Sequence, residues 1–378
     1  LAMSREETQV VAEDRAEQVL INNGYTDPEN WTAANSSPGD VDVIIAAPAG
    51  NTIQITLTAT IKTAFIHLVY RGPAAYTVTA KAKGTPPIYP FAGYGIVSLR
   101  QCSGNGATDA NVGSTGGGNS GGINVYNGGI VANLPIPASA NCGFHPPNGG
   151  SGITATGGIC NVGSETDFGG NMDPVTPNCN DGEALTDPMG PLNDNQPVCD
   201  QDGSFSGGKW QPGKYDNDPA TQAPEPGWGT YEPGIYCIEG GINPSGNGTI
   251  TGSGVLFYFI SGGIDLQGQG SISISGPSCP RTSAPEDPCT YPNLVMYSKP
   301  GNTSTFAIGG NGGSNITGTI YLPDGTLDAS GGGSNPQETV VTGQIIAWRV
   351  LNNGNGSLRL IYDESKMYVM PPTMQLVE

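Results

Sequence analysis

The chain has 378 residues, of which 59 are glycine and 32 are proline, and only 12% are charged. So much glycine and proline excludes long helices over most of the chain, and the lack of a Gly-x-y period excludes collagen. A formal net charge of -19 at pH 7 excludes nucleic acid as the partner and opposes binding to anionic lipid.

The N-terminal segment predicts a helix followed by an antiparallel sheet. Ser4 and Glu7 fit a capping box, and the apolar residues that follow recur at helical spacing. Three later stretches alternate or are rich in β-branched residues, as strands are, at residues 41–47, 52–63 and 76–83. Prolines then break the pattern, so we predict a first domain over residues 1–86.

The remainder of the chain carries a short repeat. Residues 240–251 and 262–273 each run from Gly-Gly-Ile through a Gly-x-Gly turn to a β-branched alternation, position for position. Residues 317–321 and 342–346 repeat in the same manner at a slightly larger offset. A repeat this short cannot bury its own apolar face and must stack on its neighbours. The predicted fold class is therefore mainly β, with a parallel β-helix (β-solenoid) over residues 87–378 after the small α+β domain.

Within this second domain, residues from about 135 to 233 are rich in cysteine, proline and aspartate, and strand patterns are sparse there. We predict an insertion of long loops that project from the β-helix and are held by disulfides. Acidic stretches such as 180–183 and 200–203 supply the oxygen ligands that calcium prefers, although Asp and Asn also form ordinary turns. The prediction is no cofactor, with calcium as the one ion to test.

The eight cysteines form an even set without a C-x-x-C pair or zinc spacing, which indicates disulfides and an oxidising, extracytoplasmic compartment. Cys279 and Cys289 bracket a loop between two predicted strands, so we predict that they are bonded to each other. The remaining pairings stay open, because sequence alone does not determine connectivity.

Four aromatic residues gather in the predicted insertion. Such side chains stack on sugar rings, or they fill the space between loops and the β-helix wall. Both interpretations stay open for Trp210, Tyr215, Trp228 and Tyr231, which are the candidate glycan contacts.

The sequence does not predict an enzyme. Residues 118–122 match a G-x-S-x-G elbow, but they lie in a Gly/Ser tract rather than at a strand-to-helix turn, and only His67 and His145 could serve as a base. The bases of the β-helix region are not clustered with acids in the arrangement that glycan cleavage needs. We predict no catalytic and no metal-ligating residues.

The N-terminal pattern resembles the TadE/TadG-like proteins of the tight-adherence (Flp) pilus system, through the predicted helix, the strand Ile53–Ile61 and residues 76–82. Residues 318–323 and 343–347 are similar to the β-helical region attached to many such proteins. The resemblance implies an envelope-anchored minor pilin or pilus-assembly protein with a membrane helix just before Ser4. No stretch here has the roughly 18 apolar residues of such a helix, so a membrane contact is expected only through a segment before Leu1.

These observations predict an exported, extracellular or cell-surface structural protein. We expect a pilus-associated component or filament subunit that acts in assembly or adhesion, with partners among pilus or envelope proteins or further copies of itself. Two alternatives remain, a carbohydrate-binding adhesin and a β-helical polysaccharide lyase or hydrolase. Glycan-array binding tests the first, and release of reducing ends or unsaturated products from acidic glycans tests the second.

Overall fold

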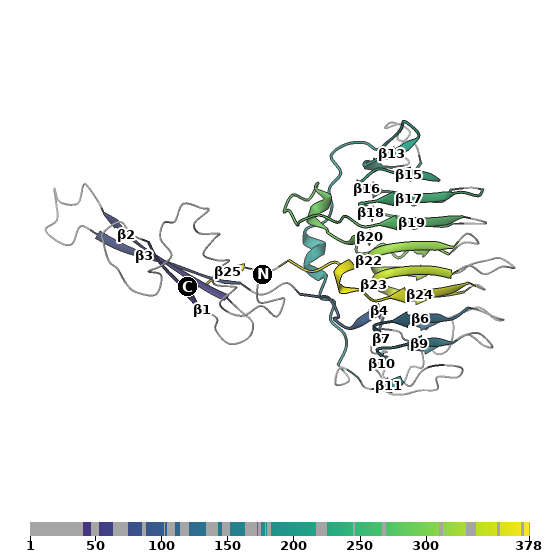
Figure 1. Ribbon diagram of the computed structural model, residues 1–378, viewed down its shortest axis with the longest axis horizontal. Helices are drawn as coiled ribbons and strands as arrows, with labels where there is room; N and C mark the ends of the chain where they lie inside the picture. The colour runs from purple at the N-terminus through teal and green to yellow at the C-terminus, as the bar shows by residue number, and fades with distance from the viewer. Residues whose placement is uncertain are drawn as a thin grey trace. The chain divides into compact units, whose positions relative to one another are not determined.

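The computed structural model is of a mainly β protein (Figure 1). The residues that it describes are 41–46, 53–62, 75–84, 88–101, 103, 110–113, 121–133, 143–145, 152–162, 172, 175–177, 179, 183–216, 225–244, 246–266, 270–309, 313–329, 338–353, 356–371 and 374–377. The predicted N-terminal helix, His67 and most of the G-x-S-x-G match lie outside these residues.

The chain divides into two compact units. Unit 1 comprises Leu1–Ile88 and Val369–Glu378, and unit 2 comprises Tyr89–Tyr368. Unit 2 is therefore an insertion between two segments of unit 1. The boundary predicted at residue 86 lies close to the first one observed. The C-terminal residues, predicted to belong to the second domain, are grouped with unit 1.

Unit 1 contains a four-stranded antiparallel sheet in the order β1-β2-β3-β25. The three strands expected from the sequence lie where the alternation placed them, within one or two residues at each end. The fourth, β25, pairs with the last residues of β3, and its four residues are too few to give a periodic signal. The strands are β1 Val41–Ala46, β2 Ile53–Lys62, β3 Ala75–Gly84 and β25 Met374–Val377.

Unit 2 contains a 21-stranded sheet in which, among the described strands, only β12 and β13 pair antiparallel. Most strands have two to five residues, and the described residues also form three short 3₁₀ helices. The strands are β4 Tyr94–Ser98, β5 Val112–Gly113, β6 Ile123–Tyr126, β7 Gly129–Ala132, β8 Phe144–His145, β9 Ile153–Ala155, β10 Ile159–Asn161, β11 Val175–Pro177, β12 Ser204–Ser206, β13 Lys209–Gln211, β14 Gly213–Tyr215, β15 Gly229–Tyr231, β16 Gly234–Ile238, β17 Thr249–Ser253, β18 Val255–Phe259, β19 Ser271–Ser275, β20 Leu294–Ser298, β21 Thr305–Ala307, β22 Ser314–Asp328, β23 Glu338–Leu351 and β24 Ser357–Ile361. The 3₁₀ helices are η6 Gly190–Asp194, η7 Pro288–Thr290 and η8 Glu364–Lys366.

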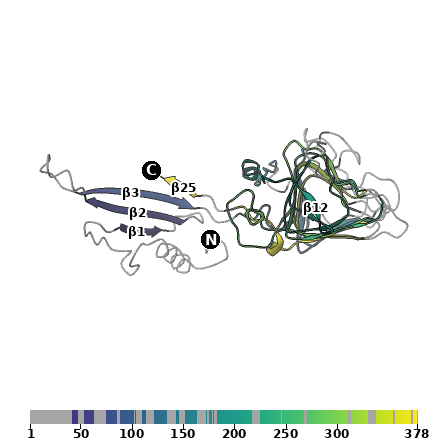
Figure 2. The same ribbon diagram turned by 90° about the horizontal axis from the view of Figure 1, so that it is seen from above.

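The sequence repeats are strand registers. Thr249 of β17 is the Cα partner of Ser271 of β19, and these two residues occupy the same position in the first pair of repeats. Likewise, Thr317 of β22 is the Cα partner of Thr342 of β23, and these begin the second pair. We call the set of strands at one level of the stack a tier. Each of these strands therefore pairs with the equivalent strand of the next repeat, one tier away. Seen from above in Figure 2, the strands of unit 2 superimpose along the sides of a three-sided outline.

The chain enters this stack in the middle. β4 pairs with β7 on one side and with β23, near the C-terminal end of the unit, on the other. From β4 the chain builds the lower half of the stack in Figure 1, β4–β11, and then crosses to the opposite end. It builds the upper half, β12–β24, back toward the middle, where β23 and β24 meet β4, β5 and β6.

The predicted insertion at 135–233 is thereby corrected. It holds strands β8–β15 of the large sheet, at both ends of the stack, rather than loops alone. Strands of two or three residues are too short to show an alternation, which is why the pattern looked sparse. Its last part ends the stack with a hairpin, in which β12 folds back on β13 through Gly207 and Gly208, both at positive φ.

A continuous apolar core runs along the inside of unit 2. The inward side chains of successive tiers form columns such as Ile96, Ile345, Ile320 and Met296, each fully buried. Aromatic rings dominate the upper end, where Trp210, Tyr215, Tyr231, Tyr236 and Phe257 contact one another with ring centroids 5.0 to 5.9 Å apart.

The Gly-x-Gly turns of the repeat have a packing role. Trp228 lies against Gly248 and Gly270, and a Cβ added at Gly270 would lie 2.1 Å from the Trp228 ring. No real Cβ makes such a contact, so glycine at the third position of both turns makes room for one indole.

We therefore predict that Gly270→Ala destabilises unit 2 by about 1–3 kcal/mol, because the indole must move out of its packed position. Gly190→Ala is the matched control, since a Cβ at Gly190 has open space around it. Urea-induced unfolding measures both variants. Equal stability of the two would contradict the packing role of Trp228.

Candidate functional site

The segment that joins the two halves of unit 2 is a strap, residues 179–199. Its described residues, 179 and 183–199, run alongside the stack (Figure 1). A disulfide fixes each end of the strap to the sheet. Cys179 is bonded to Cys160 of β10 in the lower half, and Cys199 is bonded to Cys237 of β16 in the upper half. The strap thus reaches from one end region of the stack to the other.

Both anchoring cysteines of the sheet belong to one column of Cα partners. The column consists of Cys160, Val131, Val97, Ile346, Tyr321, Tyr297, Tyr258 and Cys237, one residue per tier. These residues alternate with the inward core residues, so they point away from the core. All are nevertheless at most 5% exposed, because the strap and neighbouring loops cover them.

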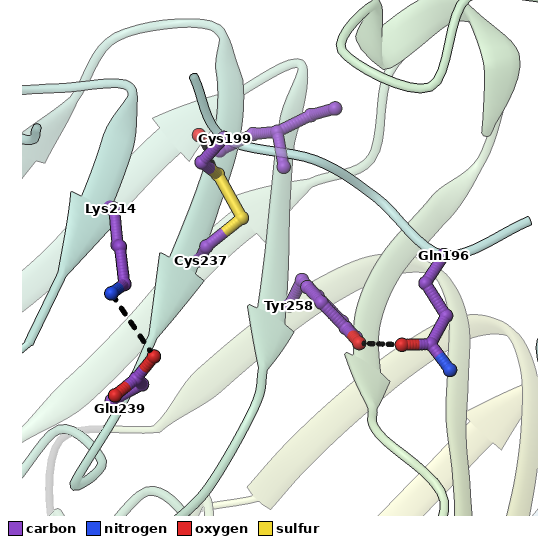
Figure 3. Close-up of a disulfide and its surroundings, with 7 residues drawn as sticks. Gln196, Cys199, Lys214, Cys237, Glu239 and Tyr258 are labelled. Carbon is purple, nitrogen blue, oxygen red and sulfur yellow. Dashed lines mark hydrogen bonds and ion pairs between the residues drawn. A yellow bond between two sulfur atoms is a disulfide. The ribbon is translucent and has the colours of Figure 1, made fainter. Parts of the chain in front are cut away.

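The strap satisfies the tyrosine hydroxyls of this column. Tyr321 donates to Asp187 Oδ2 at 2.6 Å, Tyr297 to Asn193 Oδ1 at 2.9 Å and Tyr258 to Gln196 Oε1 at 2.6 Å. Figure 3 shows the last bond beside the Cys199–Cys237 disulfide. The spacing of acceptors along the strap therefore matches the spacing of tiers, and a buried tyrosine hydroxyl needs such a partner.

Apolar contacts and two backbone anchors complete the strap. Met189 and Leu192 are buried, with 0% and 3% of their surface exposed. The Leu185 amide donates to Asn133 Oδ1, and the side-chain amide of Asn133 donates to the Leu185 carbonyl. Leu185 is thus bonded to the lower half, while Asp187 is bonded to the upper half through Tyr321.

Burial determines the acid–base properties of the column. Loss of hydration raises the pKa of the Tyr258 hydroxyl to about 12 and also raises the pKa values of Tyr297 and Tyr321. Burial likewise raises the pKa of Asp187, against the opposing effect of the hydrogen bond from Tyr321. The tyrosines of the column are therefore protonated donors throughout the physiological pH range.

A second disulfide-closed loop lies beside the strap. Cys279 is bonded to Cys289, the pair that the sequence analysis expected. Tyr291, just after this loop, donates to the carbonyl of Asn195 in the strap, and the amide of Val198 donates to the carbonyl of Pro285. The loop and Tyr291 are therefore hydrogen-bonded to the upper part of the strap.

The aromatic candidates for glycan contact occupy core positions. Tyr215 and Tyr231 are 1% exposed and Trp210 is 7% exposed, and the Tyr231 and Trp210 hydrogen-bond donors are satisfied by carbonyls within the unit. A ring with no open face cannot stack on a sugar, so these three fill the core. Trp228 is partly buried and packs against the same core.

Residues 180–182 of the first acidic stretch lie outside the described residues. Among the described residues, no group of three or more His, Cys, Asp or Glu is arranged to hold a metal ion. Asp202 lies just before β12, at the end of the stack, where the neighbouring Gly203 amide donates to the Lys214 carbonyl. Lys214 in turn forms ion pairs with Asp216 and Glu239 at 3.1 and 3.4 Å.

Threonine, serine and asparagine side chains form a regularly spaced, uncharged surface on the described part of unit 2. It lies on the upper half and is formed by the outward residues of β15, β17, β19 and the first part of β22, and we call it the hydroxyl face. Cross-tier hydrogen bonds of 3.0 to 3.1 Å join Thr230 to Thr251, Thr249 to Ser271 and Ser275 to Ser253. The face consists of Thr230, Thr249, Thr251, Ser253, Ser271, Ser273, Ser275, Asn315 and Thr317, all exposed or half-exposed.

The three disulfides of the described residues indicate a non-cytoplasmic protein, because thiols are kept reduced in the cytoplasm. Within the described part of the chain, no helix is both long and apolar enough to cross a membrane. Comparisons with protein-family models, curated proteins and solved structures find no match to this chain.

Removing the upper disulfide of the strap, Cys199–Cys237, should cost more stability than removing the loop disulfide, Cys279–Cys289. The Cys199–Cys237 bond closes a chain separation of 38 residues, and the Cys279–Cys289 bond closes one of 10. Loop-closure entropy predicts a loss of about 4 kcal/mol for Cys199→Ala/Cys237→Ala and about 3 kcal/mol for Cys279→Ala/Cys289→Ala. Urea unfolding gives both values, and the opposite order would contradict the strap's role as the stronger brace.

The tyrosine column predicts a loss of stability at alkaline pH. Because the folded-state pKa of Tyr258 lies above its unfolded value of about 10, its contribution is complete below pH 10 and declines as pH rises toward 12. Between pH 10 and 12, the free energy of unfolding of Tyr258→Phe should decline less than that of the parent, by on the order of 2 kcal/mol. At pH 8 the variant should be less stable by about 1 kcal/mol, because the hydrogen bond to Gln196 is lost.

Urea unfolding at pH values from 8 to 12, with tyrosinate absorbance recorded in parallel, measures these differences. An identical decline in the parent and in Tyr258→Phe would show that this hydroxyl ionises equally easily in the folded and unfolded chains.

Proposed function

We propose that unit 2 is a parallel β-helix and that the protein is an exported cell-surface structural component, pilus-associated or built into a filament, which acts in assembly or adhesion. The observation that carries the proposal is the strap, which is bonded covalently at both ends to a single column of the stack. Such a brace suits a part that must keep its shape outside the cell.

The stiffness of the stack supports this role. Each tier is joined to the next by parallel hydrogen bonds, by inward apolar side chains and, on one side, by the strap. Separating any two tiers therefore breaks several interactions together. A scaffold of this kind presents a surface in fixed geometry without needing mobile parts, and we infer a non-catalytic protein.

The hydroxyl face is the surface that we propose for docking. The chain carries a net charge of -19, yet the nine residues of this face are all uncharged. A partner that docks there therefore finds hydrogen-bonding groups and does not have to bury an unpaired charge, which would cost free energy. Membership of the tight-adherence pilus system remains part of the proposal. It rests on the N-terminal sequence pattern and on the similarity of residues 318–323 and 343–347 to the β-helical region of such proteins.

Cell fractionation and chemical cross-linking test this function. We expect the protein on the outside of the source cell, cross-linked to pilus or envelope components, and we expect cells that lack it to lose at least tenfold in surface attachment. Thr249→Lys/Ser273→Lys should impair rescue of attachment, whereas Val198→Lys, which adds charge at a position 43% exposed on the strap, should restore it fully.

A cytoplasmic location would contradict the proposal. So would release of reducing ends or unsaturated products from acidic glycans by the pure protein. Glycan-array binding that survives Thr249→Lys/Ser273→Lys but is lost in Trp228→Ala would favour the carbohydrate-binding adhesin instead.

A further inference from the structure

The middle of the stack contains a seam between two chain segments that are far apart in sequence. There β4, β5 and β6 of the lower half pair with β23 and β24 of the upper half. Ile96 and Ile345 are Cα partners across the seam, although they lie near opposite ends of the unit 2 sequence. The columns of Cα partners run through the seam as they run between other tiers. The lower half of one copy of the chain could therefore pair in the same register with the upper half of another copy.

Each disulfide among the described residues lies on one side of the seam. Cys160–Cys179 belongs to the lower half, and Cys199–Cys237 and Cys279–Cys289 belong to the upper half. No described disulfide therefore closes the seam. The covalent link between the halves is the strap. In unit 1, β3 precedes the lower half in the chain and β25 follows the upper half, so the pairing of β25 with β3 also joins the two sides of the seam.

The strap is long enough to act as a hinge. With the tyrosine contacts kept, the free part of the strap runs from Cys179 to Asp187. It covers four steps between tiers, from Cys160 to Tyr321, or about 19 Å at the usual strand spacing of about 4.8 Å. Fully extended, this part of the chain reaches about 28 Å. Releasing the Leu185–Asn133 bonds separates the strap from the lower half while its tyrosine contacts keep it on the upper half.

Synthesis order exposes the seam to other copies. The lower half is complete at residue 177, but its partners β23 and β24 begin only at residues 338 and 357. Until then its upper edge presents unpaired strands and the apolar residues Ile96, Val112 and Ile123, which are at most 1% exposed in the finished unit. Open parallel edges of this kind pair with any matching strand that reaches them.

We propose that the seam is an exchange interface, at which the upper half of one copy completes the lower half of a second copy of this chain. The exchanged part is everything after the strap, including β25, so each composite stack and each composite sheet of unit 1 keeps its native pairings. Two copies that exchange reciprocally form a closed dimer, and copies that exchange in succession form a chain of linked stacks. This inference stands on the seam alone and does not require the proposed cell-surface role.

Cysteines placed across the seam detect the exchange. Asn124 of β6 and Arg359 of β24 are Cα partners on the outer side of the sheet, which is close enough for a disulfide. Asn124→Cys and Arg359→Cys are made in separate full-length chains, mixed, unfolded in urea with the native disulfides intact, refolded together and oxidised. A disulfide between the two chains forms only when one copy completes the seam of the other.

The matched control is a pair within one half. Asn124 and Thr154 of β9 are also Cα partners on the outer side of the sheet, but both belong to the lower half and cannot be separated by the exchange. We expect at least tenfold more mixed dimer from Asn124→Cys with Arg359→Cys than from Asn124→Cys with Thr154→Cys. The yield should rise with protein concentration, because exchange is bimolecular.

Two further measurements make the outcome decisive. The double variant Asn124→Cys/Arg359→Cys, oxidised at low concentration, should be a monomer with a closed seam that no longer forms oligomers on size-exclusion chromatography. Native mass spectrometry of ¹⁵N-labelled and unlabelled parent chains, refolded together, should show mixed dimers without any added cysteine. Mixed-dimer yields equal to the control, together with only unmixed masses, would overturn the exchange interface and leave the proposed structural role unaffected.

Discussion

A strand of three to five residues cannot hold its shape alone, and this constraint governs unit 2. Such a strand gains enough hydrogen bonds and apolar contact only when a strand lies on each side of it. The alternation of side chains then assigns every second residue to a continuous interior column. Glycine fits the tight approaches between tiers, and Trp228 across Gly248 and Gly270 shows how a single large side chain makes use of them.

The same alternation creates a difficulty on the opposite side of the strands. Val97, Ile346 and the tyrosines after them point outward and would form an exposed apolar stripe along the stack. The strap removes this stripe from solvent, supplies an acceptor for each of three hydroxyls and is fixed by a disulfide at either end. Unit 2 is therefore held by two layers, an apolar interior and a covalently anchored outer segment.

The fold could be read from the sequence where the signal is periodic. The offsets of the two pairs of repeats are the observed strand registers, and the strands at residues 41–83 follow their alternation. The strap could not be found in the same way, because its interactions join Asp187, Asn193 and Gln196 to tyrosines up to 134 residues away. One signal was present, since Tyr258, Tyr297 and Tyr321 all occupy the same place in an apolar strand. The aromatic residues Trp210, Tyr215 and Tyr231 were identified as a group, but composition does not distinguish a binding surface from a core.

The chain enters and leaves unit 2 near the middle tiers, so both ends of the stack lie away from Tyr89 and Tyr368. Duplication of a repeat near β11 or near β15 would lengthen the molecule without moving Tyr89 or Tyr368. The strap alone must grow in step, by about one and a half extended residues for each additional tier. Related proteins of different reach could thus arise by paired changes in repeat number and strap length, with the junction to unit 1 unaltered.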